Sequence, residues 1–129
     1  MSDSGTPREL TSTIAYIGYH AAQNPDSIAV IENGREICFR DFHADLGRMV
    51  TALRQLSIAP GQVVGIECPQ FYRHWLCLLA CQAVGVVSFS YDPAEAAPLA
   101  GALAGADCIL CSPGQAPPDS RRVTVMDRD

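Results

Sequence analysis

One run of residues near the middle of the chain constrains the fold more than any other feature. Residues 63–66 and residues 86–89 are two short runs rich in β-branched side chains. Between them, residues 71–84 form an apolar stretch that is too long for an ordinary strand, and Gly85 ends it. This order predicts a strand, a helix and a second strand. Two buried strands joined by a helix are parallel and linked by a right-handed crossover, which indicates an α/β fold.

The first forty residues predict a helix and a hairpin. Thr11, Ser12 or Thr13 can cap a helix that carries apolar residues at near-helical spacing and ends at Asn24-Pro25. Two β-rich runs then flank Asn33-Gly34, at residues 28–32 and 35–39. An Asn-Gly pair between such runs is the strongest short-range signal for a two-residue hairpin.

An amphipathic helix is predicted over residues 41–56. Its apolar positions recur at three- and four-residue steps, and its polar positions fall on the opposite side. The predicted inner face consists of Phe42, Leu46, Met49, Val50, Leu53 and Leu56, and the predicted outer face of Asp45, Arg48, Arg54 and Gln55.

The last third of the chain extends the parallel pattern. Residues 94–104 predict an alanine-rich helix stopped by Gly105, and residues 107–111 predict a third parallel strand. Residues 112–122 hold three prolines and a glycine and predict a loop before a short strand at 123–126. The fold class is therefore α/β, with an open, mostly parallel, doubly wound sheet and an N-terminal β-hairpin. Residues 1–10 are expected to be a flexible lead-in, and residues 11–129 a single domain.

Composition excludes several classes of function. The chain has 129 residues, a net charge of −5 and a pI near 5.0, which argues against a nucleic-acid or anionic-membrane partner. All nine basic residues are arginine, so Schiff-base chemistry and a lysine-bearing phosphate loop are absent from these residues. Six cysteines without a visible secretory signal predict free thiols and a cytoplasmic protein. No uncharged run is long enough to predict a membrane span.

Two patterns that contain cysteine have spacings compatible with a metal or redox site. Cys108 and Cys111 have C-x-x-C spacing but fall in a predicted strand, where residues three apart point to opposite faces. His74, Cys77 and Cys81 share one face of a predicted helix, yet buried free cysteines more often serve as small apolar side chains. The favoured interpretation of both patterns is core packing. His20 and His43 are predicted to be isolated surface or boundary residues.

No nucleotide fingerprint follows the predicted strands. Cys68-Pro69-Gln70 stands where a dinucleotide-binding turn would need glycines. Gly101 and Gly105 are spaced for close helix packing and a helix stop, and Ser112-Pro113-Gly114 lacks the lysine of a phosphate loop. The residues by themselves therefore nominate no catalytic, cofactor-binding or metal-binding side chain.

Four strings in the right order give the chain a family resemblance. They are Asn-Pro-Asp-Ser-Ile-Ala-Val at 24–30, Cys-Phe-Arg-Asp-Phe at 38–42, Ser-Ile-Ala-Pro-Gly-Gln-Val-Val at 57–64, and Val-Gly-Val-Val leading to Ser-Tyr-Asp-Pro at 84–93. The chain thereby resembles the N-terminal portion of the adenylate-forming enzymes, over residues 11–126. That family comprises acyl- and aryl-CoA synthetases, luciferases and the adenylation domains of non-ribosomal peptide synthetases. Three positions depart from its pattern: Ser57 replaces a glycine, Gln62 an aspartate and Ser90 a proline.

The resemblance implies a partial subdomain of the adenylate-forming fold. The family's phosphate loop, ribose-binding aspartate and catalytic lysine lie beyond this segment, so ATP and magnesium are implied only for a full-length enzyme. One hypothesis is the scaffold segment of an ATP-dependent carboxylic acid ligase, inactive by itself, whose partner is the remainder of that ligase. The alternative is a stand-alone interaction module that binds a partner or itself through an exposed sheet edge.

Overall fold

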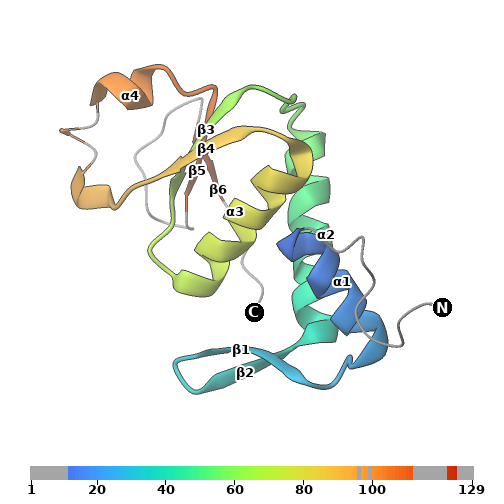
Figure 1. Ribbon diagram of the computed structural model, residues 1–129. Helices are drawn as coiled ribbons and strands as arrows, with labels where there is room; N and C mark the ends of the chain where they lie inside the picture. The colour runs from blue at the N-terminus through green and yellow to red at the C-terminus, as the bar shows by residue number, and fades with distance from the viewer. Residues whose placement is uncertain (1–11, 96, 99, 112–121, 125–129) are drawn as a thin grey trace. The chain divides into compact units, whose positions relative to one another are not determined.

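The computed structural model describes residues 12–95, 97–98, 100–111 and 122–124 (Figure 1). It divides into two compact units, residues 1–48 and 49–129, and each unit is described by itself below. The predicted lead-in and almost all of the predicted loop at 112–122 lie outside the described residues. The single domain expected over residues 11–129 stays a prediction.

The first unit begins with a capped helix and a hairpin, as predicted. Helix α1 (Thr13–Gln23) has Ser12 as its N-cap, and the Ser12 side chain accepts a hydrogen bond from the Ala15 amide at 3.1 Å. Strands β1 (Ile28–Glu32) and β2 (Arg35–Cys38) pair antiparallel as a separate two-stranded sheet. Asn33 and Gly34 have φ of 52° and 78°, the positive values that a hairpin turn of this kind requires.

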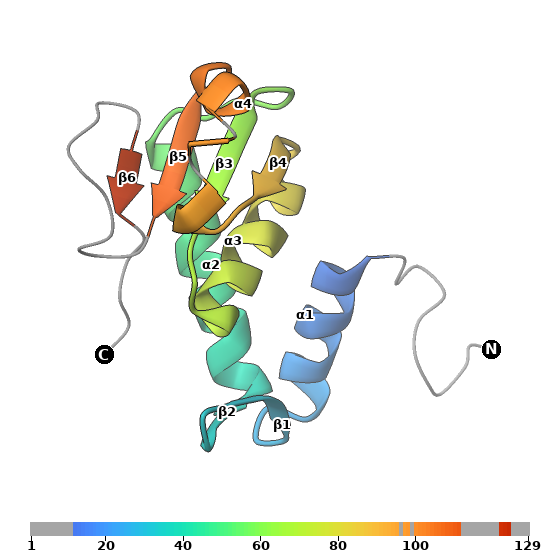
Figure 2. The same cartoon turned by 90° about the vertical axis from the view of Figure 1, so that its left-hand side faces the viewer.

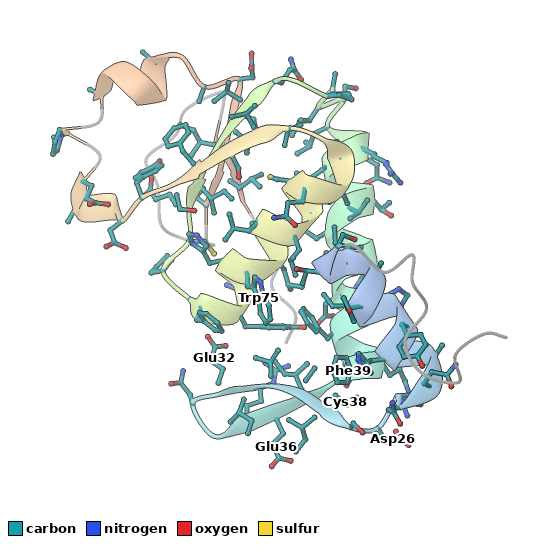
Figure 3. All side chains as sticks on the ribbon, viewed as in Figure 1. Asp26, Glu32, Glu36, Cys38, Phe39 and Trp75 are labelled. Atoms are coloured by element: carbon teal, nitrogen blue, oxygen red, sulfur yellow. The ribbon has the colours of Figure 1, made fainter. Side chains whose placement is uncertain are left out.

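The hairpin leads directly into helix α2 (Phe39–Gln55). The amides of Phe39 and Arg40 donate at 3.0 Å to the carbonyls of Ser27 and Pro25, so the turn before β1 satisfies two donors at the start of the helix. Asp26 in that turn forms an ion pair with Arg40. Figure 3 shows Asp26, together with Phe39, at the junction of the hairpin with α2. This interaction explains why the helix begins at Phe39 rather than at the predicted Asp41.

The two predicted faces of α2 need two corrections. Phe42, Leu46, Met49 and Leu53 are buried as predicted, and Arg48, Arg54 and Gln55 are exposed. Asp45, however, is buried, because Arg48 lies one turn away and pairs with its carboxylate. Leu56 is exposed rather than buried, because the helix ends at Gln55.

The second unit contains a four-stranded sheet with every pairing parallel. Its elements are β3 (Val63–Glu67), α3 (Phe71–Val84), β4 (Val87–Ser90), the 3-10 turn η1 (Pro93–Glu95), α4 (Ala100–Ala104), β5 (Cys108–Cys111) and β6 (Arg122–Thr124). The strand order is β4-β3-β5-β6, which Figure 2 shows nearly face-on. Helices α3 and α4 lie on opposite sides of the sheet (Figure 1), as a doubly wound fold requires. The predicted fold class is confirmed.

The predicted helix over residues 94–104 is wrong as one continuous element. The chain instead forms η1 and then the short helix α4. Pro98 lies between them, and proline lacks the amide donor and disfavours a helical conformation at the residue before it. Helix propensity of the alanines therefore yields to one proline. Strand β6 begins at Arg122, one residue before the prediction, and the predicted residues 125–126 lie outside the described residues.

The core of this unit surrounds β3. Val64 and Ile66 are fully buried in the strand, which is hydrogen-bonded to β4 on one side and to β5 on the other. Ile109 and Leu110 of β5 are also buried, as is Leu76 of α3. The interior position predicted for Ile66 is confirmed.

We expect Ile66→Ala to lower the free energy of unfolding by about 2–5 kcal/mol, because the cavity at a fully buried site cannot be filled by solvent. Urea denaturation measures this loss. Val87→Ala in β4 is the matched control, because Val87 is 56% exposed and its truncation should change stability by only about 0.5 kcal/mol or less. Equal effects of the two substitutions would contradict the central position of β3.

Helices α2 and α3 are both followed by a residue with a left-handed backbone conformation, but the two residues differ. Helix α3 ends at Gly85, with φ of 84°, and the Val86 amide donates to the Cys81 carbonyl at 3.1 Å. The end of α2 has Ser57 at the equivalent position, with φ of 60°, and the Ile58 amide donates to the Leu53 carbonyl at 3.5 Å. Serine thus occupies a backbone conformation that favours glycine.

We expect Ser57→Gly to stabilise the chain by about 0.5–1 kcal/mol. The substitution removes the cost of a left-handed backbone at serine, and the greater conformational entropy of glycine in the unfolded chain offsets part of that gain. Gly85→Ala should act in the opposite direction, by about 1 kcal/mol. A β-carbon at residue 85 would lie 3.7 Å from Pro60 Cβ, an ordinary contact, so its cost is conformational. Thermal unfolding of both variants measures the effect, and a lowered midpoint for Ser57→Gly would contradict it.

Candidate functional site

The candidate site lies at the carboxyl ends of strands β3, β4 and β5. The chain leaves β3 toward β4 on one side and later returns to β5 on the other side. Two neighbouring strands whose connections run in opposite directions define a switch point, and ligands of open α/β sheets bind beyond the strand ends there. The polar side chains at this edge are therefore the first to consider.

A buried carboxylate and a buried phenol meet at this edge. Glu67 is the last residue of β3 and is 3% exposed, and Tyr91, directly after β4, is 4% exposed. The Tyr91 hydroxyl donates to Glu67 Oε1 at 2.6 Å, a short hydrogen bond. The Tyr91 amide also donates to the Ile66 carbonyl at 3.1 Å, which holds the ring in place. The pair ties the ends of two strands together inside the protein.

Gly65 allows two aromatic rings to cover β3. The rings of Phe89 and Tyr91 stack with their centroids 5.9 Å apart. A β-carbon at Gly65 would lie 3.1 Å from Phe89 Cζ, tighter than most such contacts, and 3.4 Å from Tyr91 Cε1, an ordinary contact. The glycine thus leaves room for the Phe89 ring against β3.

His74 joins the same strand ends from the first turn of α3. Its Nδ1 lies 2.8 Å from the Cys68 carbonyl oxygen, and its Nε2 lies 2.7 Å from Ser90 Oγ. Cys68 directly follows β3, and Ser90 is the last residue of β4. The imidazole therefore bridges the two strand ends on the exposed side of the site, whereas the Glu67–Tyr91 pair bridges them in the interior.

The sequence pattern of His74, Cys77 and Cys81 does not assemble into one site. His74 directs both ring nitrogens to oxygen atoms, while Cys77 and Cys81 are fully buried. A hydrogen bond with Cys68, together with burial, raises the pKa of the Cys77 thiol. Burial and the neighbouring Cys108 raise the pKa of Cys81 to about 11. Within the described ranges, no group of three or more His, Cys, Asp or Glu side chains is arranged to hold a metal ion.

The other candidates from the sequence are separate from this site. Cys108 and Cys111 are buried in β5, the core position favoured for them. His20 is not isolated, because its ring lies 5.1 Å from that of Phe39 and also contacts Tyr16 and Tyr19, and His43 is exposed. The close packing predicted at Gly101 is wrong, since a β-carbon there would meet no atom of the described residues within 4 Å. Ser112-Pro113-Gly114 lies outside the described residues.

We expect only Cys38 to react rapidly with iodoacetamide in the folded chain. All six cysteines are free thiols, and Cys38 is half-buried whereas the other five are buried. Alkylation needs an accessible thiolate, and burial disfavours the thiolate of Cys81 and Cys108. Mass spectrometry should find one adduct under native conditions and six after denaturation. A second rapidly labelled cysteine would contradict the buried positions.

The residues at this edge do not fit a nucleoside triphosphate with magnesium. The turn after β3 reaches α3 through Gln70, whose side chain makes no capping hydrogen bond. The described acidic groups near the strand ends include Glu67, Asp92 and Glu95, which repel phosphate. The whole sequence has no lysine to balance them. A triphosphate would need several cations and a glycine-rich backbone, whereas the described residues here offer Arg73 in the first turn of α3 and Cys68-Pro69-Gln70 as the turn.

The second unit is a parallel α/β sheet whose polar side chains Glu67, Tyr91, His74 and Ser90 gather at the carboxyl ends of β3 and β4. The sequence profile of the family described as AMP-binding enzyme matches residues 18–125. The chain therefore belongs to the AMP-binding enzyme family, as its resemblance to adenylate-forming enzymes predicted.

Known relatives agree with this assignment. The chain is 27% identical over 84 residues to an acetyl-coenzyme A synthetase of Penicillium chrysogenum, an alignment covering 60% of this chain and 13% of that protein. Its fold is similar to an artificially fused adenylation-PCP di-domain, NpsA-ThdA from Klebsiella oxytoca, with a TM-score of 0.71 and 17% identity over 87% of this chain and 22% of that one. It is also similar to O-succinylbenzoate coenzyme A synthetase of Bacillus subtilis in complex with AMP, with a TM-score of 0.66 and 18% identity. That match covers 85% of this chain and 31% of the synthetase chain.

The chain thus spans only a small part of the length of the relatives that it matches. It corresponds to a fragment of an adenylation domain. No helix in the described part of the chain is both long and apolar enough to cross a membrane.

The residues of the site were not found from the sequence because each pair is distant along the chain. His74 and Ser90 are 16 residues apart, and Glu67 and Tyr91 are 24 apart. A signal was nevertheless present: in a strand-helix-strand unit, the first turn of the helix and the end of the second strand meet at one edge. Polar residues at those two places are expected to pair.

Proposed function

We propose that the chain is the N-terminal scaffold segment of an ATP-dependent ligase that adenylates a carboxylic acid, and that it is inactive by itself. The observation that carries this proposal is the family match over residues 18–125 on a chain that covers 13% of an acetyl-coenzyme A synthetase. Its role would be to support one wall of the active-site region with a rigid parallel sheet. The remainder of the ligase chain would then be its partner.

The packing of the sheet suits a supporting role. Strand β3 is buried, and its carboxyl end is fixed twice, by the Glu67–Tyr91 pair inside and by His74 outside. Strand ends held in this way position the loops that follow them. Rigid elements that fix loops in place are what a catalytic constellation needs from its scaffold.

The same residues argue against adenylation by this segment alone. Charge builds on the phosphates as pyrophosphate leaves, and cations with oriented amides must stabilise it. The sequence has no lysine and a net charge of −5. A phosphate site would therefore have to come from other parts of the polypeptide.

We expect residues 1–129 to show no ATP–pyrophosphate exchange with any carboxylic acid, and no ATP binding by calorimetry at millimolar nucleotide. The natural product of the gene, if it continues into the rest of the ligase, should show exchange with at least one acid in a panel of acyl, aryl and amino acids. Exchange by residues 1–129 alone would contradict the scaffold role. If a longer product shows no exchange with any acid in the panel, the result would favour an interaction module. Such a module would use an edge strand such as β4, where Val87 is 56% exposed.

A further inference from the structure

The geometry points to Ser90 as a nucleophile activated by His74, and hence to a site of covalent acylation by small activated carboxylic esters. This inference concerns a reaction of the scaffold's own side chains and does not depend on the proposed ligase function. It rests on three groups that converge from β3, α3 and β4: the Cys68 carbonyl, the His74 ring and the Ser90 hydroxyl.

The Cys68 carbonyl defines which nitrogen of the His74 ring carries the proton in the neutral imidazole. A backbone carbonyl oxygen only accepts, so Nδ1 of His74 carries the proton and donates to the Cys68 oxygen at 2.8 Å. In the neutral ring, Nε2 then holds a lone pair and accepts from the Ser90 hydroxyl at 2.7 Å. A nucleophile, a base within hydrogen-bond reach and a third group that orients the base form the arrangement that activates serine.

Both reacting groups are accessible from one side. Ser90 is exposed and His74 is only partly buried. The hydroxyl is also not part of the family pattern, which has proline where this chain has Ser90. The exposed Ser90 hydroxyl thus lies directly beside the His74 ring.

The reaction balances without a further reactant. Ser90 Oγ attacks the ester carbonyl carbon while its proton passes to Nε2 of His74. The C–O bond to the leaving group then breaks. With a p-nitrophenyl ester, a nitrophenolate departs with the electron pair, and His74 returns the proton to solvent. The product is an ester on Ser90 Oγ.

The two amides that follow Ser90 are both engaged, which restricts the site to activated donors. The Tyr91 amide donates to the Ile66 carbonyl at 3.1 Å, and the Asp92 amide donates to Glu95 Oε1 at 2.8 Å. Neither of the two amides that follow Ser90 is therefore available to stabilise an oxyanion. Without such donors, an ester with a good leaving group reacts but an amide does not.

The test is incubation of the chain with p-nitrophenyl acetate, followed by intact-mass measurement and peptide mapping. We expect one acetyl group on Ser90, formed about a hundredfold or more faster than on Ser57, because a positioned base contributes at least about that factor. Ser57 is an internal reference, since it is exposed and lies in the same compact unit. The absence of lysine leaves the terminal amine as the only competing primary amine.

His74→Gln tests the role of His74 as a base separately from its role in joining the two strand ends. An amide can keep hydrogen bonds to Ser90 and Cys68, but it cannot take the proton. With an unchanged melting temperature, acetylation of Ser90 should fall to the level of Ser57. Ser90→Cys gives a second readout: iodoacetamide should alkylate Cys at this position faster than Cys38, and His74→Gln in that background should remove the difference. Labelling of Ser90 no faster than Ser57, or unaffected by His74→Gln, would overturn the inference.

Discussion

The burial of strand β3 is the constraint on which the second unit depends. A parallel strand with neighbours on both edges can satisfy its backbone groups only through those neighbours, so β4 and β5 must pair with it in register. Its two faces then require apolar side chains, which Val64 and Ile66 supply. Polar groups are restricted to the strand ends. The position of Glu67, and with it the whole candidate site, follows from this restriction.

Much of the fold was predictable because its signals are local. Asn33-Gly34 sets a hairpin through the backbone conformations that those two residues allow. Gly85 stops α3 for the same kind of reason. Where the prediction of helix failed, at residues 94–104, the sequence held a second local signal: Pro98 opposes the alanines on either side of it. The alanines alone predict a continuous helix, and the proline among them prevents it.

The candidate site was much less predictable, because it is built from tertiary partners. Asp45 falls on the polar side of the α2 pattern, and its carboxylate is buried and paired with Arg48 one turn away. His74 suggested a metal site with Cys77, but its ring turns to Cys68 and Ser90 instead. The side chain that decides its orientation lies on the next strand. Spacing along a helix shows which residues share a face, and it does not show what that face meets.

The chemistry of the strand ends also bears on the scaffold role proposed for this segment. Glu67 places a buried acidic side chain at the carboxyl end of β3. In the proposed scaffold role, the segment holds its sheet rigid, and either apolar or hydrogen-bonded contacts can do so. The bridge between His74 and Ser90 joins two strand ends through a base and a hydroxyl. The reactivity proposed for Ser90 would then follow from the way the two strand ends are held together, and it would need no separate selection.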